Sequence, residues 1–112
     1  MSRSSDHNIP LVSVIMPFHN VADHIHAAIS SILNQTHQNL ELILCNDGST
    51  DKSEEVAHSF QDNRIVYLKN SEKKGIPFSR NACLKSAKGA YIAVLDSDDI
   101  ALPDRIEKQV DF

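Results

Sequence analysis

The chain has 112 residues, of which 41% are hydrophobic and 23% are charged, and its net charge is −4. This length fits one domain, and the composition is that of a folded globular protein rather than a disordered one. The acidic balance argues against nucleic acid as the main partner, because surfaces that bind nucleic acid are normally basic.

The cysteines and the length of the apolar segments indicate where in the cell the protein is expected. Cys45 and Cys83 lie within predicted elements, which is typical of small buried hydrophobic residues in a reducing compartment. No segment approaches the ~20 apolar residues of a membrane-spanning helix. Residues 1–8 are polar and lack the apolar core of a signal peptide, and we interpret residues 1–10 as a flexible leader. We therefore expect a cytoplasmic protein, with the inner face of a membrane as one place where it can act.

Predicted strands and helices alternate four times along the chain. Strands are predicted over residues 11–16, 40–45, 65–68 and 90–95, and helices over residues 22–33, 52–60, 78–88 and from Pro103 onward. Pro17 is expected to end the first strand, since proline lacks a backbone N–H. The apolar run from Ala90 to Leu95 predicts a strand buried on both faces. This alternation indicates the α/β class, with an open parallel sheet of about four strands and flanking helices.

Three carboxylates follow the last predicted strand directly, at Asp96, Asp98 and Asp99. Side chains alternate in an extended segment, so we expect Asp96 and Asp98 to point the same way. Adjacent carboxylates repel unless a cation lies between them, and Mg²⁺ or Mn²⁺ accepts oxygen ligands of this kind. The alternative is that these aspartates cap a helix or form a solvated turn, and this segment alone does not decide between the two.

The first two predicted strands also end in polar turns, Pro17-Phe18-His19-Asn20 and Asn46-Asp47-Gly48-Ser49. The carboxyl ends of parallel strands lie along one edge, where open α/β sheets bind ligands, so we expect both turns to share a pocket with the aspartates. Asp47 can accept a hydrogen bond from the imide N–H of a uracil ring. For this tetrapeptide alone, an ordinary Asp-Gly turn before a helix cap is a slightly better explanation.

Arg80 lies near the start of the third predicted helix, just after the cationic segment Lys73-Lys74-Gly75. Its guanidinium can pair with a diphosphate or stack on a base, and a surface arginine is an equally good explanation without further context.

Short motifs run in a fixed order from Val12 to the end of the chain: Pro17-x-x-Asn20, Asn46-Asp47-Gly48-Ser49-Thr50-Asp51, Ser79-Arg80-Asn81, Gly89-x-Tyr91-Ile92, Leu95-Asp96-Ser97-Asp98-Asp99 and Leu102-Pro103. In this order they resemble the N-terminal, donor-binding half of family 2 glycosyltransferases, which have the Rossmann-like GT-A fold. The chain departs from the family pattern at Asn46, where many members have a second aspartate, and at His19, where an aromatic residue such as tyrosine is usual.

The resemblance implies an inverting, metal-dependent transfer of a sugar from a nucleotide-diphosphate donor, usually a UDP-sugar, to an acceptor hydroxyl. It implies that Asp47 contacts the uracil, that Asp96 lies near the ribose and the metal, and that Asp98 is the direct ligand of Mg²⁺ or Mn²⁺. The implied nucleotide-sugar-binding residues are Pro17, His19, Asn20, Asp47, Arg80 and Asp96, and the implied metal ligands are Asp98 and Asp96.

By the same resemblance, residues 11–112 form a truncated half whose general base lies in a missing C-terminal part, so the fragment alone should be inactive. The implied acceptor is a glycan or glycolipid. We also expect the last strand to expose an apolar edge and to promote a homodimer. The alternative is a non-catalytic or degenerate nucleotide-binding α/β module. Receiver modules have paired acids after the first strand, and nucleotidyltransferases have a glycine-rich loop there; this chain has neither.

Overall fold

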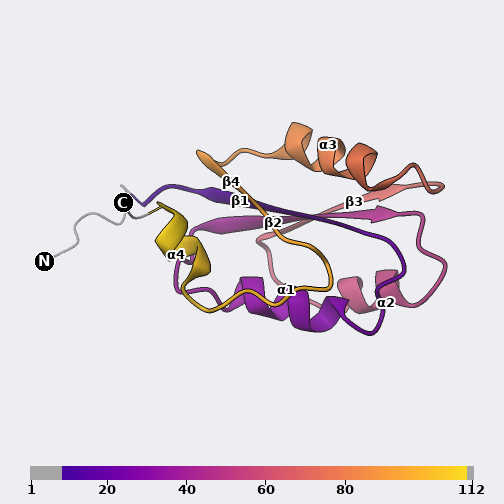
Figure 1. Ribbon diagram of the computed structural model, residues 1–112, viewed down its shortest axis with the longest axis horizontal. Coiled ribbons are helices and arrows are strands. Elements are labelled where there is room, and N and C mark those ends of the chain that lie inside the picture. Colours follow the sequence, from indigo (N-terminus) through magenta and orange to yellow (C-terminus); the bar gives the residue numbers. More distant parts are fainter. Residues whose placement is uncertain (1–8, 111–112) are drawn as a thin grey trace, which may run out of the picture.

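The structure of the chain is a computed structural model that describes residues 9–110, so most of the predicted leader lies outside the described residues. The chain forms a four-stranded parallel sheet in the order β3-β2-β1-β4, with helices on both faces (Figure 1). The elements are β1 (Val12–Phe18), α1 (Ile25–Leu33), β2 (Leu40–Asp47), α2 (Ser53–His58), β3 (Ile65–Asn70), α3 (Ile76–Ser86), β4 (Tyr91–Val94) and α4 (Arg105–Val110). The predicted α/β class and parallel sheet are confirmed.

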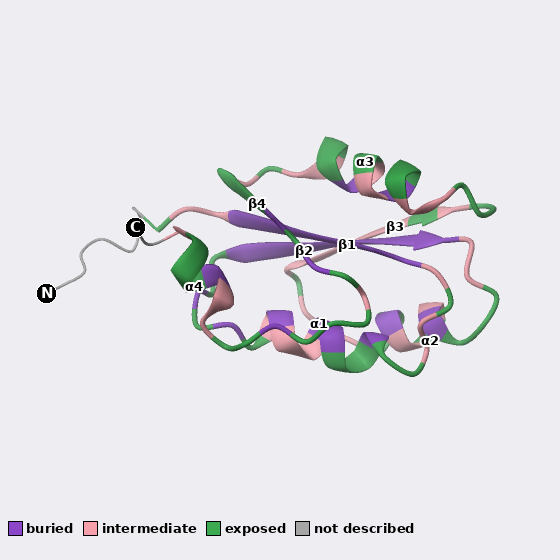
Figure 2. Ribbon diagram, viewed as in Figure 1, coloured by how far each residue is buried: buried purple, intermediate pink, exposed green. Residues whose placement is uncertain are grey.

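β1 lies inside the sheet, and its side chains alternate between two hydrophobic layers. Val14 and Met16 belong to the larger core, which includes the apolar face of α1, whereas Ile15 packs in a smaller cluster with Cys45 and Cys83. Both cysteines are buried free thiols. Figure 1 shows α1 and α2 on one face of the sheet and α3 on the other. Because both faces are covered, β1 and β2 are buried along their whole length (Figure 2).

The prediction that Pro17 ends the first strand is wrong, because β1 continues to Phe18 and Pro17 pairs in register with Cys45. Backbone groups of alternate β1 residues point toward β4, as the bond from the Leu95 N–H to the Ile15 carbonyl shows. Pro17 is two residues beyond Ile15, so the backbone N–H that proline lacks would also point toward β4. Since β4 ends at Val94, opposite Ile15, no ladder bond is lost at Pro17.

The last strand also differs from its prediction. β4 covers only Tyr91–Val94, and Tyr91, Ile92 and Val94 are each 41–42% exposed, so the strand is not buried on both faces. Its apolar run is interior-like, but β4 lies at the end of the strand order and pairs only with β1 in the described part of the chain. The place of β4 at the edge of the sheet therefore leaves its side chains more exposed than its apolar sequence predicts.

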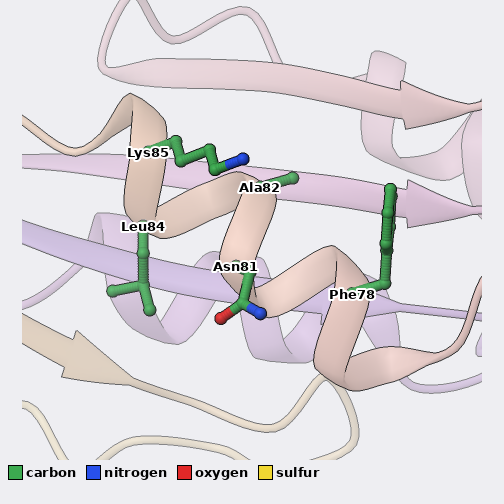
Figure 3. Close-up of a pocket in the computed structure, with 5 residues that line it drawn as sticks. All are labelled: Phe78, Asn81, Ala82, Leu84 and Lys85. Atoms are coloured by element: carbon green, nitrogen blue, oxygen red, sulfur yellow. The ribbon is translucent and has the colours of Figure 1, made fainter.

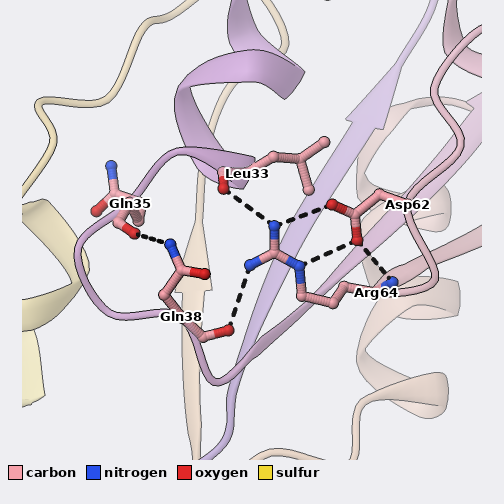
Figure 4. Close-up of polar contacts among 5 residues, drawn as sticks. All are labelled: Leu33, Gln35, Gln38, Asp62 and Arg64. Atoms are coloured by element: carbon pink, nitrogen blue, oxygen red, sulfur yellow. Dashed lines mark hydrogen bonds and ion pairs between the residues drawn. The ribbon is translucent and has the colours of Figure 1, made fainter.

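Arg64 fixes the opposite end of the sheet, where β3 begins (Figure 4). Its guanidinium donates to the carbonyls of Leu33 at 3.0 Å and Gln38 at 3.2 Å, and it forms an ion pair with Asp62 at 3.0 Å. The hydrogen bonds that Arg64 donates to the Asp62 carboxylate, from its guanidinium and its backbone N–H, hold the pKa of Asp62 below its usual value. The end of α1 and the approach to β2 are therefore tied to β3. None of the helices that the structure describes has the length and apolar character needed to cross a membrane.

Candidate functional site

A pocket of about 440 Å³ opens where β1 and β4 end. It brings together four of the predicted site residues, from loops far apart in the sequence. Its lining residues are Pro17, His19, Val21, Lys73, Ile76, Asp96, Ser97 and Asp98. Four of these lining residues were not predicted as site residues, namely Val21, Lys73, Ile76 and Ser97. The only sequence signal for any of them was the cationic segment that contains Lys73.

The three acidic side chains after β4 form a compact group, of which Asp96 and Asp98 line this pocket and Asp99 lines a neighbouring hollow. Carboxylate oxygens of Asp96, Asp98 and Asp99 lie within 4.8 Å of one another, and all three residues are exposed. A turn groups them rather than strand alternation, since β4 has ended and the Asp99 N–H donates to the Asp96 carbonyl at 3.0 Å. Carboxylates that are close together and open to water fit Mg²⁺ or Mn²⁺, which keeps water ligands and binds phosphate oxygens.

Asp47 lies deeper than expected and is not among the residues that line this pocket. Its side chain is fully buried at the end of β2. Oδ1 accepts hydrogen bonds from the Lys74 N–H at 2.7 Å and the Asn70 amide at 3.0 Å, and Oδ2 accepts from the Gly75 N–H at 2.9 Å. Burial alone would raise the pKa of Asp47, but these hydrogen bonds outweigh burial and lower it. Asp47 therefore anchors the loop between β3 and α3 as an ionised carboxylate.

Gly48 lets that loop approach the end of β2. It has a φ of +64°, and a Cβ atom at this position would lie 2.5 Å from the Lys73 nitrogen. Only glycine combines this backbone conformation with so close a contact. Asp47 and Gly48 thus place the loop that carries Lys73 to the wall of the pocket.

His19 follows β1 directly and is partly buried. Its Nδ1 lies 2.7 Å from the carbonyl oxygen of Asp47. Because a carbonyl can only accept a hydrogen bond, Nδ1 carries the hydrogen, and this bond sets the ring orientation in the pocket wall.

Asn20 and Arg80 do not line the pocket among the described residues. Asn20 has a φ of 51°, a conformation that asparagine tolerates better than most residues. Its Oδ1 accepts hydrogen bonds from the Thr50 N–H at 2.8 Å and the Asp51 N–H at 3.3 Å, so it joins the loops after β1 and β2. Arg80 lies half-buried on α3.

A second hollow of about 470 Å³ lies along α3 (Figure 3). It is lined by Phe78, Asn81, Ala82, Leu84 and Lys85. It contains no acidic side chain among these residues, and its walls are mainly apolar. This hollow therefore offers no carboxylate to a metal ion.

This combination defines an α/β protein with a polar ligand pocket at the carboxyl edge of a parallel sheet. Solved structures with a similar fold include Staphylococcus aureus TarS (residues 1–349) in complex with UDP, with a TM-score of 0.80 and 25% identity over 88% of this chain and 30% of that one. A mannosyltransferase from Pyrobaculum calidifontis, in complex with GDP-Man and Mn²⁺, has a TM-score of 0.74 and 26% identity over 81% of this chain and 28% of that one. The chain has the architecture of a partial GT-A fold.

The sequence matches the model of the family described as glycosyl transferase family 2 over residues 13–112, and the chain belongs to this family. The Escherichia coli UDP-Glc:alpha-D-GlcNAc-diphosphoundecaprenol beta-1,3-glucosyltransferase WfaP is 44% identical over 102 residues, which are 91% of this chain and 41% of WfaP. Pasteurella multocida chondroitin synthase is 44% identical over 102 residues, or 90% of this chain and 11% of the synthase. The chain thus spans well under half the length of these relatives.

Proposed function

We propose that the chain is the donor-binding part of an inverting, metal-dependent glycosyltransferase that uses a UDP-sugar and transfers the sugar to an acceptor hydroxyl. The observation that carries this proposal is the shared pocket. Grouped carboxylates, a lysine and the end of β1 meet in one cavity of about 440 Å³. A nucleoside diphosphate has the matching chemistry, with a flat base at one end and negative oxygens at the other.

Asp98 and Asp96 would hold Mg²⁺ or Mn²⁺ on the open side of the pocket. When bound, such an ion neutralises charge on the diphosphate and helps its departure from the sugar. Lys73 adds a cation of the chain itself to the same wall, where its ammonium can contact phosphate oxygens. Pro17 and Val21 supply apolar surface for the nucleoside.

The remaining predicted donor residues act more indirectly in this proposal. Asp47 and Asn20 hold the loops that shape the pocket. Contact between Arg80 and the donor stays a prediction. The general base that receives the acceptor proton is assigned to none of these residues.

The names of the relatives suggest the partners. WfaP is named as an enzyme that acts with UDP-Glc on a diphosphoundecaprenol-linked sugar. By analogy we propose a glycan or glycolipid acceptor for this chain, and work at the cytoplasmic face of a membrane.

Calorimetric titration with UDP, with and without Mn²⁺, tests the proposal. We expect binding that depends on Mn²⁺ and that Asp98→Asn weakens by about tenfold or more, as for the loss of a contact to a charged group. The matched control is Asp23→Asn, an exposed carboxylate in the turn before α1, which should bind UDP like the wild type. UDP binding that is indifferent both to Mn²⁺ and to Asp98→Asn would instead indicate a degenerate nucleotide-binding module.

A further inference from the structure

We propose that Gln35, which lies two residues beyond the end of α1, is a positioning residue for the metal site. It holds the chain that follows the acidic turn and thereby keeps Asp96 and Asp98 close together. This inference rests on the proposed function, in which those two carboxylates hold Mg²⁺ or Mn²⁺. Gln35 is not among the residues that line the pocket, so its effect on the ion passes through the backbone of the turn.

The side chain of Gln35 is fully buried and uses its amide in both directions. Nε2 donates to the Leu102 carbonyl at 2.6 Å and to the Ser31 carbonyl at 3.1 Å, and Oε1 accepts from the Ile106 N–H at 2.9 Å. A carbonyl only accepts and an N–H only donates, so these partners fix the orientation of the amide. Glutamate would lack the donor and methionine would lack both groups, so this position requires a long amide side chain.

Two neighbours of this glutamine bind the same stretch of chain. The Ala101 N–H donates to the Ser31 hydroxyl at 3.0 Å, and the Thr36 N–H donates to the Pro103 carbonyl at 2.8 Å. Figure 1 shows the chain after β4 running beside α1 before it enters α4. Residues 101–106 are therefore fixed against the end of α1 by polar bonds, with the buried amide at their centre.

The acidic turn lies between two such anchors. Before it, the Leu95 N–H donates to the Ile15 carbonyl of β1 at 3.1 Å, and after it Ala101 is held by α1. All three aspartates of residues 96–100 are exposed, so packing does little to group them. Adjacent carboxylates repel one another when no cation is bound. The two anchors keep the turn closed against this repulsion, and loss of Gln35 would loosen the second one.

The experiment measures UDP binding by calorimetry at a series of Mn²⁺ concentrations, for the wild-type chain, Gln35→Met and Gln35→Glu. We expect the half-saturating Mn²⁺ concentration to rise by about threefold to tenfold in both variants, because each removes the donor to the Leu102 carbonyl. UDP affinity at saturating Mn²⁺ should change little. A merely structural role would lower the fraction of folded chain and would leave the half-saturating Mn²⁺ concentration unchanged.

Amide hydrogen exchange in the metal-free chain gives a second readout that needs no ligand. Exchange at residues 97–101 should be faster in Gln35→Met than in the wild type, because the turn opens more often. The matched control is Ile29→Val, which removes one methyl group from the buried face of α1 and leaves the bonds to residues 101–106 in place. It should keep the wild-type Mn²⁺ dependence and the wild-type exchange of the turn.

Ser31→Ala is the milder variant and decides the question if Gln35→Met does not fold. It removes the bond to the Ala101 N–H and should shift the Mn²⁺ dependence in the same direction. Wild-type Mn²⁺ dependence in all folded variants overturns the inference and leaves Mn²⁺-dependent UDP binding, and with it the proposed function, intact. An equal shift in Ile29→Val also overturns it, because general loss of stability would then be the cause. A wild-type chain without Mn²⁺-dependent UDP binding overturns both proposals.

Discussion

Asp47 combines two properties that usually conflict, full burial and a pKa below the ordinary value of an aspartate. Burial opposes ionisation, and the conflict is resolved by two backbone N–H groups and one amide that donate to the carboxylate. The same bonds hold the loop that carries Lys73. A single residue therefore links the end of β2 to the pocket wall.

Asp47→Asn should lower the free energy of unfolding by about 1–3 kcal/mol at neutral pH, because the amide group places a donor against the donors of the loop. The folded-state pKa of Asp47 is lowered, so its stabilisation is fully present above the unfolded-state pKa of about 3.9 and is lost as the pH falls toward the folded-state value. Urea unfolding at pH 7 and pH 3 measures this. We expect the difference between wild type and variant to narrow at pH 3, and a difference of the same size at both values would mean that the charge is not the cause.

At the scale of whole elements, a buried polar cluster positions β4. The Ser13 hydroxyl donates to Glu41 Oε2 at 2.6 Å, and the same oxygen accepts the Lys88 N–H at 2.7 Å. The Gly89 N–H donates to the Ser13 hydroxyl at 2.8 Å. A Cβ atom on Gly89 would lie 2.7 Å from both the Leu11 carbonyl and the Ser13 nitrogen. The connection from α3 to β4 is thereby fixed against β1, and the acidic turn that follows β4 is placed with it.

Gly89→Ala should lower the free energy of unfolding by about 1–3 kcal/mol, since the added methyl group meets backbone atoms that cannot move aside. Thermal or denaturant unfolding measures the change. The neighbouring substitution Ala90→Ser, at an exposed position, is the control and should stay within about 0.5 kcal/mol of the wild type. If Gly89→Ala were as stable as this control, the close approach of β1 and the α3–β4 connection would not constrain the fold.

At the scale of the whole molecule, the described sheet leaves β4 as an apolar edge. Tyr91, Ile92 and Val94 are exposed there, and Ile100 and Leu102 beyond the strand are 69% and 72% exposed. Unpaired backbone groups beside apolar side chains favour pairing with another strand. The predicted self-association of the 112-residue chain has its best candidate surface here.

Light scattering over a range of protein concentrations should show that the chain associates and that Val94→Lys reduces the association. Leu84→Lys is a matched control, because Leu84 and Val94 are both 41% exposed but Leu84 lies on α3. A strict monomer at high concentration would contradict the prediction. Loss of association in Leu84→Lys alone would move the contact to the hollow along α3 (Figure 3).

The order and type of the elements could be predicted from the chain, because long apolar runs in a strand–helix alternation leave few other arrangements. The apolar stripe of α1 is an example, and its residues Ile25, Ala28, Ile29 and Ile32 are all buried. The meeting of Pro17 and His19 with Asp96 and Asp98 was also predictable, since carboxyl ends of parallel strands share an edge. The elements depend on the local spacing of apolar residues, and the shared pocket depends on the rule that parallel strands end at the same edge of the sheet.

Only the tertiary structure decided what each of these residues does in its place. Pro17 is tolerated within β1 because β4 happens to be short, and β4 is exposed because only β1 pairs with it among the described residues. Asp47 is buried, and Lys73 reaches the pocket, because a loop 27 positions further along the chain folds over Gly48. Such outcomes depend on which segments become neighbours in space, and neither hydrophobic periodicity nor a short motif contains that information.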